Sequence, residues 1–255
     1  MVNAYLYSFA RLRCSLESIS RIFMASVERP DIPFVFDFTQ NEYKLTSWCS
    51  YIARDPLRYQ DCTVTSVDHR KSSGSKEHEY LCITILHTSG HTAFLVVERC
   101  VDVSSSSDAM KIGVQSTAPR EAYDRLKTLK KLPKDDGESI SVTKWAFNNP
   151  DRTPSVLQLS VALSVVSHHA PTYNVYAYQC YWYAHTASEL LRLLFQGEDV
   201  TSDPSKKRQR GKLSSCNVPT QDSIAAVRDG YQVAWELLNN QMSEVREELQ
   251  NNTMV

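Results

Sequence analysis

Alternating apolar and polar positions predict a β-hairpin near the middle of the chain. Residues 78–86 and 92–99 are rich in Ile, Val, Leu and aromatic side chains, which are typical of strands. The segment Thr88-Ser89-Gly90 between them predicts a turn, because glycine adopts backbone angles that other residues avoid. We expect this hairpin to lie at the centre of an antiparallel sheet.

Other segments have the spacing of helices or of further strands. Helices are expected over 44–54, 119–131, 154–168, 180–195 and 221–249, and strands over 34–38, 63–67, 139–147 and near 212–218. Pro154 fits the first turn of one helix, and Gly197 is expected to close another. Helices and strands are segregated along the chain rather than alternating, so the predicted class is α+β, with the sheet packed against helices.

The length of 255 residues suits one main domain with its own hydrophobic core. We expect a helical extension at 1–30 followed by a single α+β domain at 31–255. Residues 70–76 are polar and predict a loop. Four consecutive serines at 104–107 and the polar run 133–137 predict a mobile insertion near 101–138.

The charge balance excludes an obvious polyelectrolyte partner. The chain has 28 basic and 29 acidic residues, and its main basic run, 206–212, lacks the aromatic side chains of a nucleic-acid groove. We therefore expect a solvated loop there and no nucleic-acid partner. The longest apolar run, 156–166, is interrupted by polar residues and is far shorter than the roughly 20 residues of a bilayer-spanning helix, so no membrane span is expected.

The cysteines indicate a reducing compartment. The seven cysteines are odd in number, scattered, and free of Cys-x-x-Cys spacing, which argues against a disulfide framework and against a zinc ribbon. The N-terminal residues lack the features of a signal peptide, so the cytoplasm, or the nucleus, is the expected location.

His168, His169 and His185 lie near Cys180 in sequence but point to different sides of their helices, and the chain lacks a Gly-rich phosphate loop. We expect no metal and no cofactor.

Cys180 is the strongest candidate for chemistry. It opens the predicted helix 180–195, where free backbone N–H groups and the helix dipole favour a thiolate. The same N–H groups suit an oxyanion hole, so one position would provide the nucleophile and part of the hole. A thiolate needs a base, and His78 opens the first strand of the hairpin.

The hairpin register indicates which residue orients His78. Pairing residue 84 with residue 94 places Tyr80 opposite Glu98, on the same face as His78 and diagonal to it. Glu98 is therefore the expected third member of the site. A slip of one residue would put Arg99 there instead.

These motifs resemble the circularly permuted papain-like superfamily that includes lecithin:retinol acyltransferase-like proteins. The shared order is a histidine at a strand start, a hairpin, a long insertion, and a cysteine that opens a helix within Tyr-Gln-Cys-Tyr-Trp-Tyr-Ala. In that superfamily the cysteine commonly follows Asn and precedes an aromatic three residues on; here these positions hold Gln179 and Tyr183. The motif Cys-Tyr-Trp-aromatic-Ala is also similar to a motif in a group of uncharacterised fungal proteins. The resemblance implies a permuted papain-like core and a thiol hydrolase or acyltransferase acting on an amide, isopeptide or ester bond of a peptide, protein or acyl substrate.

Each candidate also has a simpler interpretation. Cys180 shares a helical stripe with Tyr183 and Leu191 and is equally explained as a buried core residue. His78 and Glu98 are also explained as solvated residues at strand ends. The alternative function is a noncatalytic protein-interaction module on the same fold.

Overall fold

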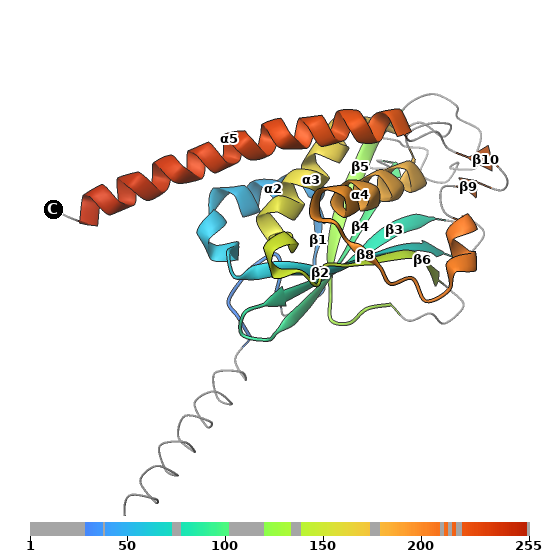
Figure 1. The fold of residues 1–255 in the computed structure, drawn as a ribbon, viewed down its shortest axis with the longest axis horizontal. Helices are drawn as coiled ribbons and strands as arrows, with labels where there is room; N and C mark the ends of the chain where they lie inside the picture. The colour runs from blue at the N-terminus through green and yellow to red at the C-terminus, as the bar shows by residue number, and fades with distance from the viewer. Residues whose placement is uncertain are drawn as a thin grey trace, which may run out of the picture.

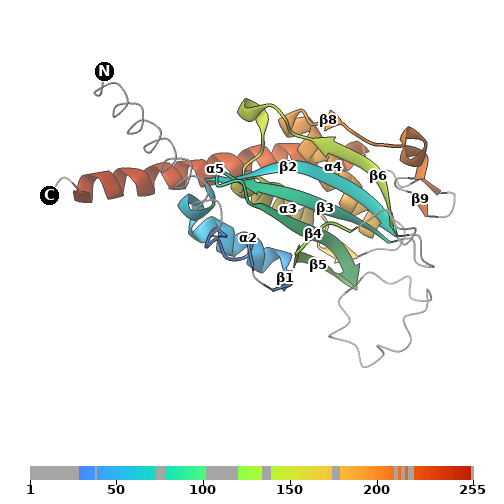
Figure 2. The same ribbon diagram turned by 90° about the horizontal axis from the view of Figure 1, so that it is seen from below.

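The computed structural model describes residues 29–37, 39–72, 78–101, 120–133, 139–173, 179–209, 212–213, 216–217 and 221–253. Its centre is an antiparallel sheet with the strand order β1-β5-β4-β3-β2-β6-β8, and β7 pairs with β5 (Figures 1 and 2). The strands are β1 (Glu42–Lys44), β2 (Cys62–Ser72), β3 (Glu79–His87), β4 (Thr92–Val101), β5 (Arg120–Leu129), β6 (Ser139–Ala146), β7 (Thr172–Tyr173) and β8 (Glu198–Asp199). The α+β class and the antiparallel sheet are confirmed.

Helices cover one face of this sheet, and a longer helix crosses over them (Figure 2). They are α2 (Leu45–Arg54), α3 (Val156–His169), α4 (Cys180–Phe195) and α5 (Gln221–Thr253), with the short 3-10 helices η1 (Pro56–Tyr59), η2 (Pro150–Arg152) and η3 (Pro204–Gln209). α4 packs on β2, β3 and β4, α2 on β1 and β5, and α3 on β2, while α5 packs on α3 and α4. None of the helices in the described ranges combines the length and the apolar run needed to cross a bilayer.

The predicted hairpin is formed by β3 and β4. Leu86 pairs with Thr92 across the turn, and Gly90 has a φ of +88°, in the left-handed region that glycine tolerates. Leu81, Ile83 and Ile85 on β3 are fully buried against the helices. This face of the hairpin therefore forms the floor of the hydrophobic core.

Local sequence signals at their ends also define the helices α3 and α4. Ser155 and Gln158 form a capping box at the start of α3, each side chain bonding to the other residue's backbone N–H at 3.1 and 2.9 Å. α4 ends at Phe195, and the N–H of Gly197 donates to the carbonyl of Arg192 at 3.2 Å, so Gly197 takes part in closing the helix as expected, although the left-handed residue is the C-cap Gln196, with φ of 52°. Gly197 is also required for packing, because a Cβ there would lie 2.9 Å from Cε1 of Phe147.

The strand predicted at 34–38 is wrong. Residues 33–35 form a turn in which Phe34 has a φ of 66°. The backbone N–H of Phe34 donates to Asp37 Oδ1 at 2.9 Å, and its carbonyl accepts from Trp48 Nε1 at 2.9 Å. These local bonds, together with stacking of Phe34 on Tyr51, outweigh the strand propensity of the aromatic side chains.

The helix predicted at 119–131 is also wrong, because this segment contains β5. Asp124, Leu126 and Thr128 are buried while the residues between them point to the other face, which is the period of a strand. β5 lies between β1 and β4, within the region where we expected an insertion. The rest of that insertion, 102–119 and 134–138, lies outside the described residues.

Two boundaries differ from expectation. β2 extends to Ser72, so residues 70–72 of the expected loop are strand; Arg70 pairs with Tyr80 on β3. The single strand expected near 212–218 is instead a pair of short strands, β9 (Lys212–Leu213) and β10 (Cys216–Asn217). Most of the helical extension expected at 1–30 lies outside the described residues.

Candidate active site

Cys180 lies at the first position of α4, as its sequence predicted. Gln179 caps this helix in an extended conformation, and its carbonyl accepts the first intrahelical bond from Tyr183 N at 3.0 Å. Only 6% of Cys180 is exposed. The thiol is thus placed at the N-terminus of α4, the positive end of the helix dipole.

His78 lies directly before β3 and is held at the end of β2. Its backbone N–H donates to Ser72 Oγ at 2.9 Å, and its carbonyl accepts from Ser72 N at 2.8 Å. The imidazole stacks on Tyr80 with ring centroids 6.1 Å apart. About a quarter of its side chain, 28%, remains exposed, so one edge of the ring can be reached from solvent.

Glu98 is the hydrogen-bond partner of His78. Thr84 pairs with Phe94, which is the predicted register, and Glu98 Oε2 lies 2.7 Å from His78 Nε2. The other oxygen, Oε1, accepts from Arg125 Nε at 2.8 Å and from Lys127 Nζ at 2.7 Å. Burial raises the pKa of Glu98, but the hydrogen bonds from His78 and Lys127 and their positive charges outweigh it and hold the pKa at about 2.

The imidazole joins the carboxylate to the thiol. Cys180 lies close enough to the imidazole to raise the pKa of His78, and Glu98 hydrogen-bonds to the same ring, so the three residues predicted from the sequence lie together. Burial lowers the pKa of His78, but its interactions with Cys180 and Glu98 and the charges of these two groups raise it to a net value of about 9. The imidazole therefore holds its proton at neutral pH.

Arg99, the alternative third residue, lies on the opposite face of the sheet. It is 1% exposed, and its Nε and one terminal nitrogen donate to the two carboxylate oxygens of Asp124, each at 2.7 Å. The guanidinium lies 5.2 Å from the ring centre of Trp182 and 5.0 Å from that of Tyr183. Arg99 thus anchors the first turn of α4 to β4 and so positions the helix start that carries Cys180.

Sequence reasoning missed two residues next to this site. Cys100 follows Glu98 by two residues on the same face of β4, and one potential ligand atom from each of His78, Glu98 and Cys100 lies within 4.8 Å of the others. Tyr173 on β7 lies near the Cys180 backbone N–H, the amide that we expected in an oxyanion hole. Burial, together with the charges of Cys180 and Cys100, raises the pKa of Tyr173.

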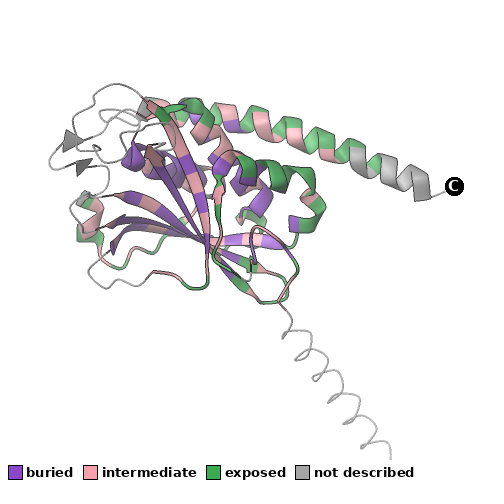
Figure 3. Cartoon of the chain, turned by 180° about the vertical axis from the view of Figure 1, so that it is seen from behind, coloured by how far each residue is buried: buried purple, intermediate pink, exposed green. Residues whose placement is uncertain are grey.

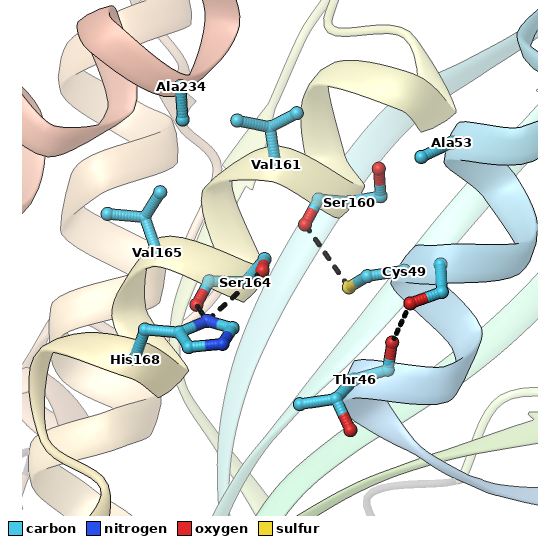
Figure 4. Close-up of a pocket in the computed structure, with 10 residues that line it drawn as sticks. Thr46, Cys49, Ala53, Ser160, Val161, Ser164, Val165, His168 and Ala234 are labelled. Atoms are coloured by element: carbon cyan, nitrogen blue, oxygen red, sulfur yellow. Dashed lines mark hydrogen bonds between the residues drawn. The ribbon is translucent and has the colours of Figure 1, made fainter. Parts of the chain in front are cut away.

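A separate cavity of about 300 Å³ lies between α2, α3 and α5, with Cys49 and His168 in its wall (Figure 4). Cys49 Sγ donates to the carbonyl of Ser160 at 3.3 Å, and burial raises the pKa of this thiol to about 12. His168 Nδ1 lies 2.8 Å from the carbonyl of Ser164. The sulfur and the imidazole of this cavity are engaged with the backbone, and the cavity wall contains none of the three site residues.

Comparisons of the chain with protein-family models, with curated proteins and with solved structures found no match.

Proposed function

We propose that this protein is a thiol hydrolase or acyltransferase in which Cys180 is the nucleophile. The observation that carries the proposal is the convergence of Cys180, His78 and Glu98 at a helix start. A thiolate paired with an imidazolium, which is oriented in turn by a carboxylate, is the arrangement that covalent acyl transfer requires. The resemblance to the permuted papain-like superfamily points to the same chemistry.

The reaction would proceed in two acyl-transfer steps. The Cys180 thiolate adds to the carbonyl carbon of an amide, isopeptide or ester, and His78 then gives its proton to the departing amine or alcohol. In the second step His78 takes a proton from water or from an acceptor alcohol or amine, which attacks the thioester and frees Cys180. Glu98 remains ionised throughout because its pKa is about 2, and it holds the imidazole in place.

The oxyanion formed in each step needs a hydrogen-bond donor. The Cys180 backbone N–H at the start of α4 is suitably placed, and Tyr173 lies near it. A substrate carbonyl oxygen would accept the hydrogen bond of this N–H. Such an enzyme would act on a peptide, protein or lipid acyl substrate in the cytoplasm or nucleus, where a reducing environment preserves the thiol.

The pH 7 alkylation rate of Cys180 by iodoacetamide, followed by peptide mass spectrometry, tests this proposal. We expect the rate to fall at least about tenfold in His78→Gln, because the variant removes the imidazolium that stabilises the thiolate. His91→Gln, in the exposed turn of the same hairpin, is the matched control and should react at the wild-type rate. Cys82, which is fully buried, provides an internal standard for unfolding in every sample.

Incubation with p-nitrophenyl acetate extends the test to acyl transfer. We expect a burst of nitrophenolate and an acetyl group on Cys180 in the wild type, and neither in Cys180→Ala. A wild-type thiol that reacts slowly, with or without His78, would overturn the enzyme proposal.

The second candidate is a noncatalytic interaction module, and the observation that favours it is the burial of Cys180, of which 6% is exposed. A thiol that only fills the core should react at the rate of Cys82. A rate for Cys180 far above that of Cys82 would exclude this alternative.

A further inference from the structure

His78, Glu98 and Cys100 form a compact cluster of metal-ligating side chains. One nitrogen, one carboxylate oxygen and one sulfur lie within 4.8 Å of each other. Glu98 and Cys100 come from alternate positions of β4 and therefore share a face of the sheet, while His78 lies directly before β3. Two neighbouring strands thus supply the three donors, which gives the cluster a rigid base.

The donor set selects a particular class of ion. Imidazole, thiolate and carboxylate together suit Zn²⁺, whereas Mg²⁺ and Ca²⁺ require oxygen ligands almost exclusively. Around a tetrahedral zinc ion with bonds of about 2.0–2.3 Å, ligand atoms are separated by roughly 3.4–3.8 Å. The three donor atoms therefore need to move by less than the length of a bond to enclose the ion.

The surroundings of the cluster also fit a metal site. Glu98 Oε1 is fixed by Arg125 and Lys127, which leaves Oε2 directed at His78. His78 and Cys100 are both partly exposed, so an ion can enter from solvent. Cys180 lies outside this cluster of three but acts on the charges of both His78 and Cys100, so it lies nearby and would be the fourth ligand.

We propose that His78, Glu98 and Cys100 bind Zn²⁺, with Cys180 as the fourth ligand, and that the bound ion blocks the Cys180 thiol. Binding forms bonds from the metal to the imidazole, the carboxylate and the two sulfurs, and the protons of the thiols and of the imidazole pass to solvent. The ion takes the imidazole lone pair and the thiolate that acyl transfer requires. The site formed by His78, Glu98 and Cys100 rests on ligand geometry alone, and only its effect on the reactivity of Cys180 rests on the proposed function.

Titration of the reduced full chain with Co²⁺ tests the binding site. Cobalt is a spectroscopic substitute for zinc, and we expect a thiolate-to-cobalt charge-transfer band that added Zn²⁺ abolishes. Cys100→Ala should weaken binding more than about tenfold, because it removes a direct ligand. Cys82→Ala is the matched control, since Cys82 is a fully buried thiol on the neighbouring strand β3 and is not part of the cluster.

The outcomes separate the metal site from the enzyme proposal. Absence of the charge-transfer band, or a band of equal strength in Cys100→Ala, would overturn the metal site. The alkylation rate of Cys180 with and without Zn²⁺ tests the block: we expect Zn²⁺ to slow the wild type and to have little effect on Cys100→Ala. Failure of the enzyme proposal would be recognised separately. In that case the wild type would bind Co²⁺ as expected, but the alkylation rate of Cys180 in metal-free protein would be the same with and without His78.

Discussion

At the scale of single residues, the His78–Glu98 pair couples the stability of the fold to pH. Folding raises the pKa of His78 from 6.5 to about 9, so the folded chain holds its proton when the unfolded chain has lost it. The stabilisation is therefore fully present below about pH 6.5 and is lost as pH rises through 9. Glu98, with a pKa of about 2, stays ionised across this window.

We expect the free energy of unfolding of the wild type, relative to that of His78→Gln, to fall between pH 6.5 and 9 by about 1–3 kcal/mol. Urea unfolding at a series of pH values, with a chelator present, measures this difference. His91→Gln retains the pair and should lose stability in parallel with the wild type. A difference between wild type and His78→Gln that is constant across the window would contradict the proposed charge state of His78.

Sequence patterns revealed those site residues that follow from local periodicity. Cys180 was found from the start of a helix, and Glu98 from the register of one hairpin. The alternation of side chains along a strand also places Cys100, two residues beyond Glu98, on the same face of β4. Once Glu98 is assigned to the site, Cys100 is therefore recognisable as its neighbour. Tyr173 had no such signal, since its position depends on a two-residue strand that pairs with Arg120, far away in the sequence.

At the scale of the elements, the buried Arg99–Asp124 pair fixes α4 on the sheet. Arg99 and Asp124 belong to the adjacent strands β4 and β5, and the two aromatic rings that the Arg99 guanidinium contacts belong to α4. We expect Arg99→Met to reduce the free energy of unfolding by about 3–5 kcal/mol, because it leaves the Asp124 carboxylate buried without its main partner. Arg58→Met removes the exposed Arg58–Asp31 pair and should cost less than about 1 kcal/mol.

The double variant Arg99→Met/Asp124→Leu distinguishes the pair from simple loss of packing. It removes both charges, so we expect urea unfolding to show part of the lost stability restored. A double variant that loses the sum of the two single effects would show that the charges do not interact.

The same elements explain which parts of the fold the sequence could predict. The hairpin, α3 and α4 have matching local signals for their strand period, caps and turns. β5 was mistaken for a helix because its outward face carries the charges Arg125 and Lys127, which also suit a solvated helix. Its true partners, β1 and β4, belong to other parts of the chain, and local spacing does not reveal them.

At the scale of the whole molecule, the protein has three layers: the sheet, the helices α2, α3 and α4, and the long helix α5. Figure 3 shows mostly buried residues on the strands and many exposed residues along α5. α5 contacts the body through Val227 and Tyr231, and Tyr231 meets Phe195 at the last turn of α4 with ring centroids 6.3 Å apart. The candidate site lies at the other end of α4, about 22 Å away along the helix axis.

Because of this distance, we expect substitutions in α5 to change the free energy of unfolding without changing the reactivity of Cys180. We expect Val227→Ala to lower the free energy of unfolding by about 2 kcal/mol, because Val227, a residue of α5, is fully buried. Val233→Ala on the same helix should change it by less than about 0.5 kcal/mol, because Val233 is 68% exposed. Neither variant should alter the alkylation rate of Cys180 in folded protein, since Arg99 of β4 packs on the first turn of α4, whereas Tyr231 of α5 meets its last turn. Urea unfolding and alkylation of the same samples measure both quantities, and a slower Cys180 in Val227→Ala alone would instead couple α5 to the site.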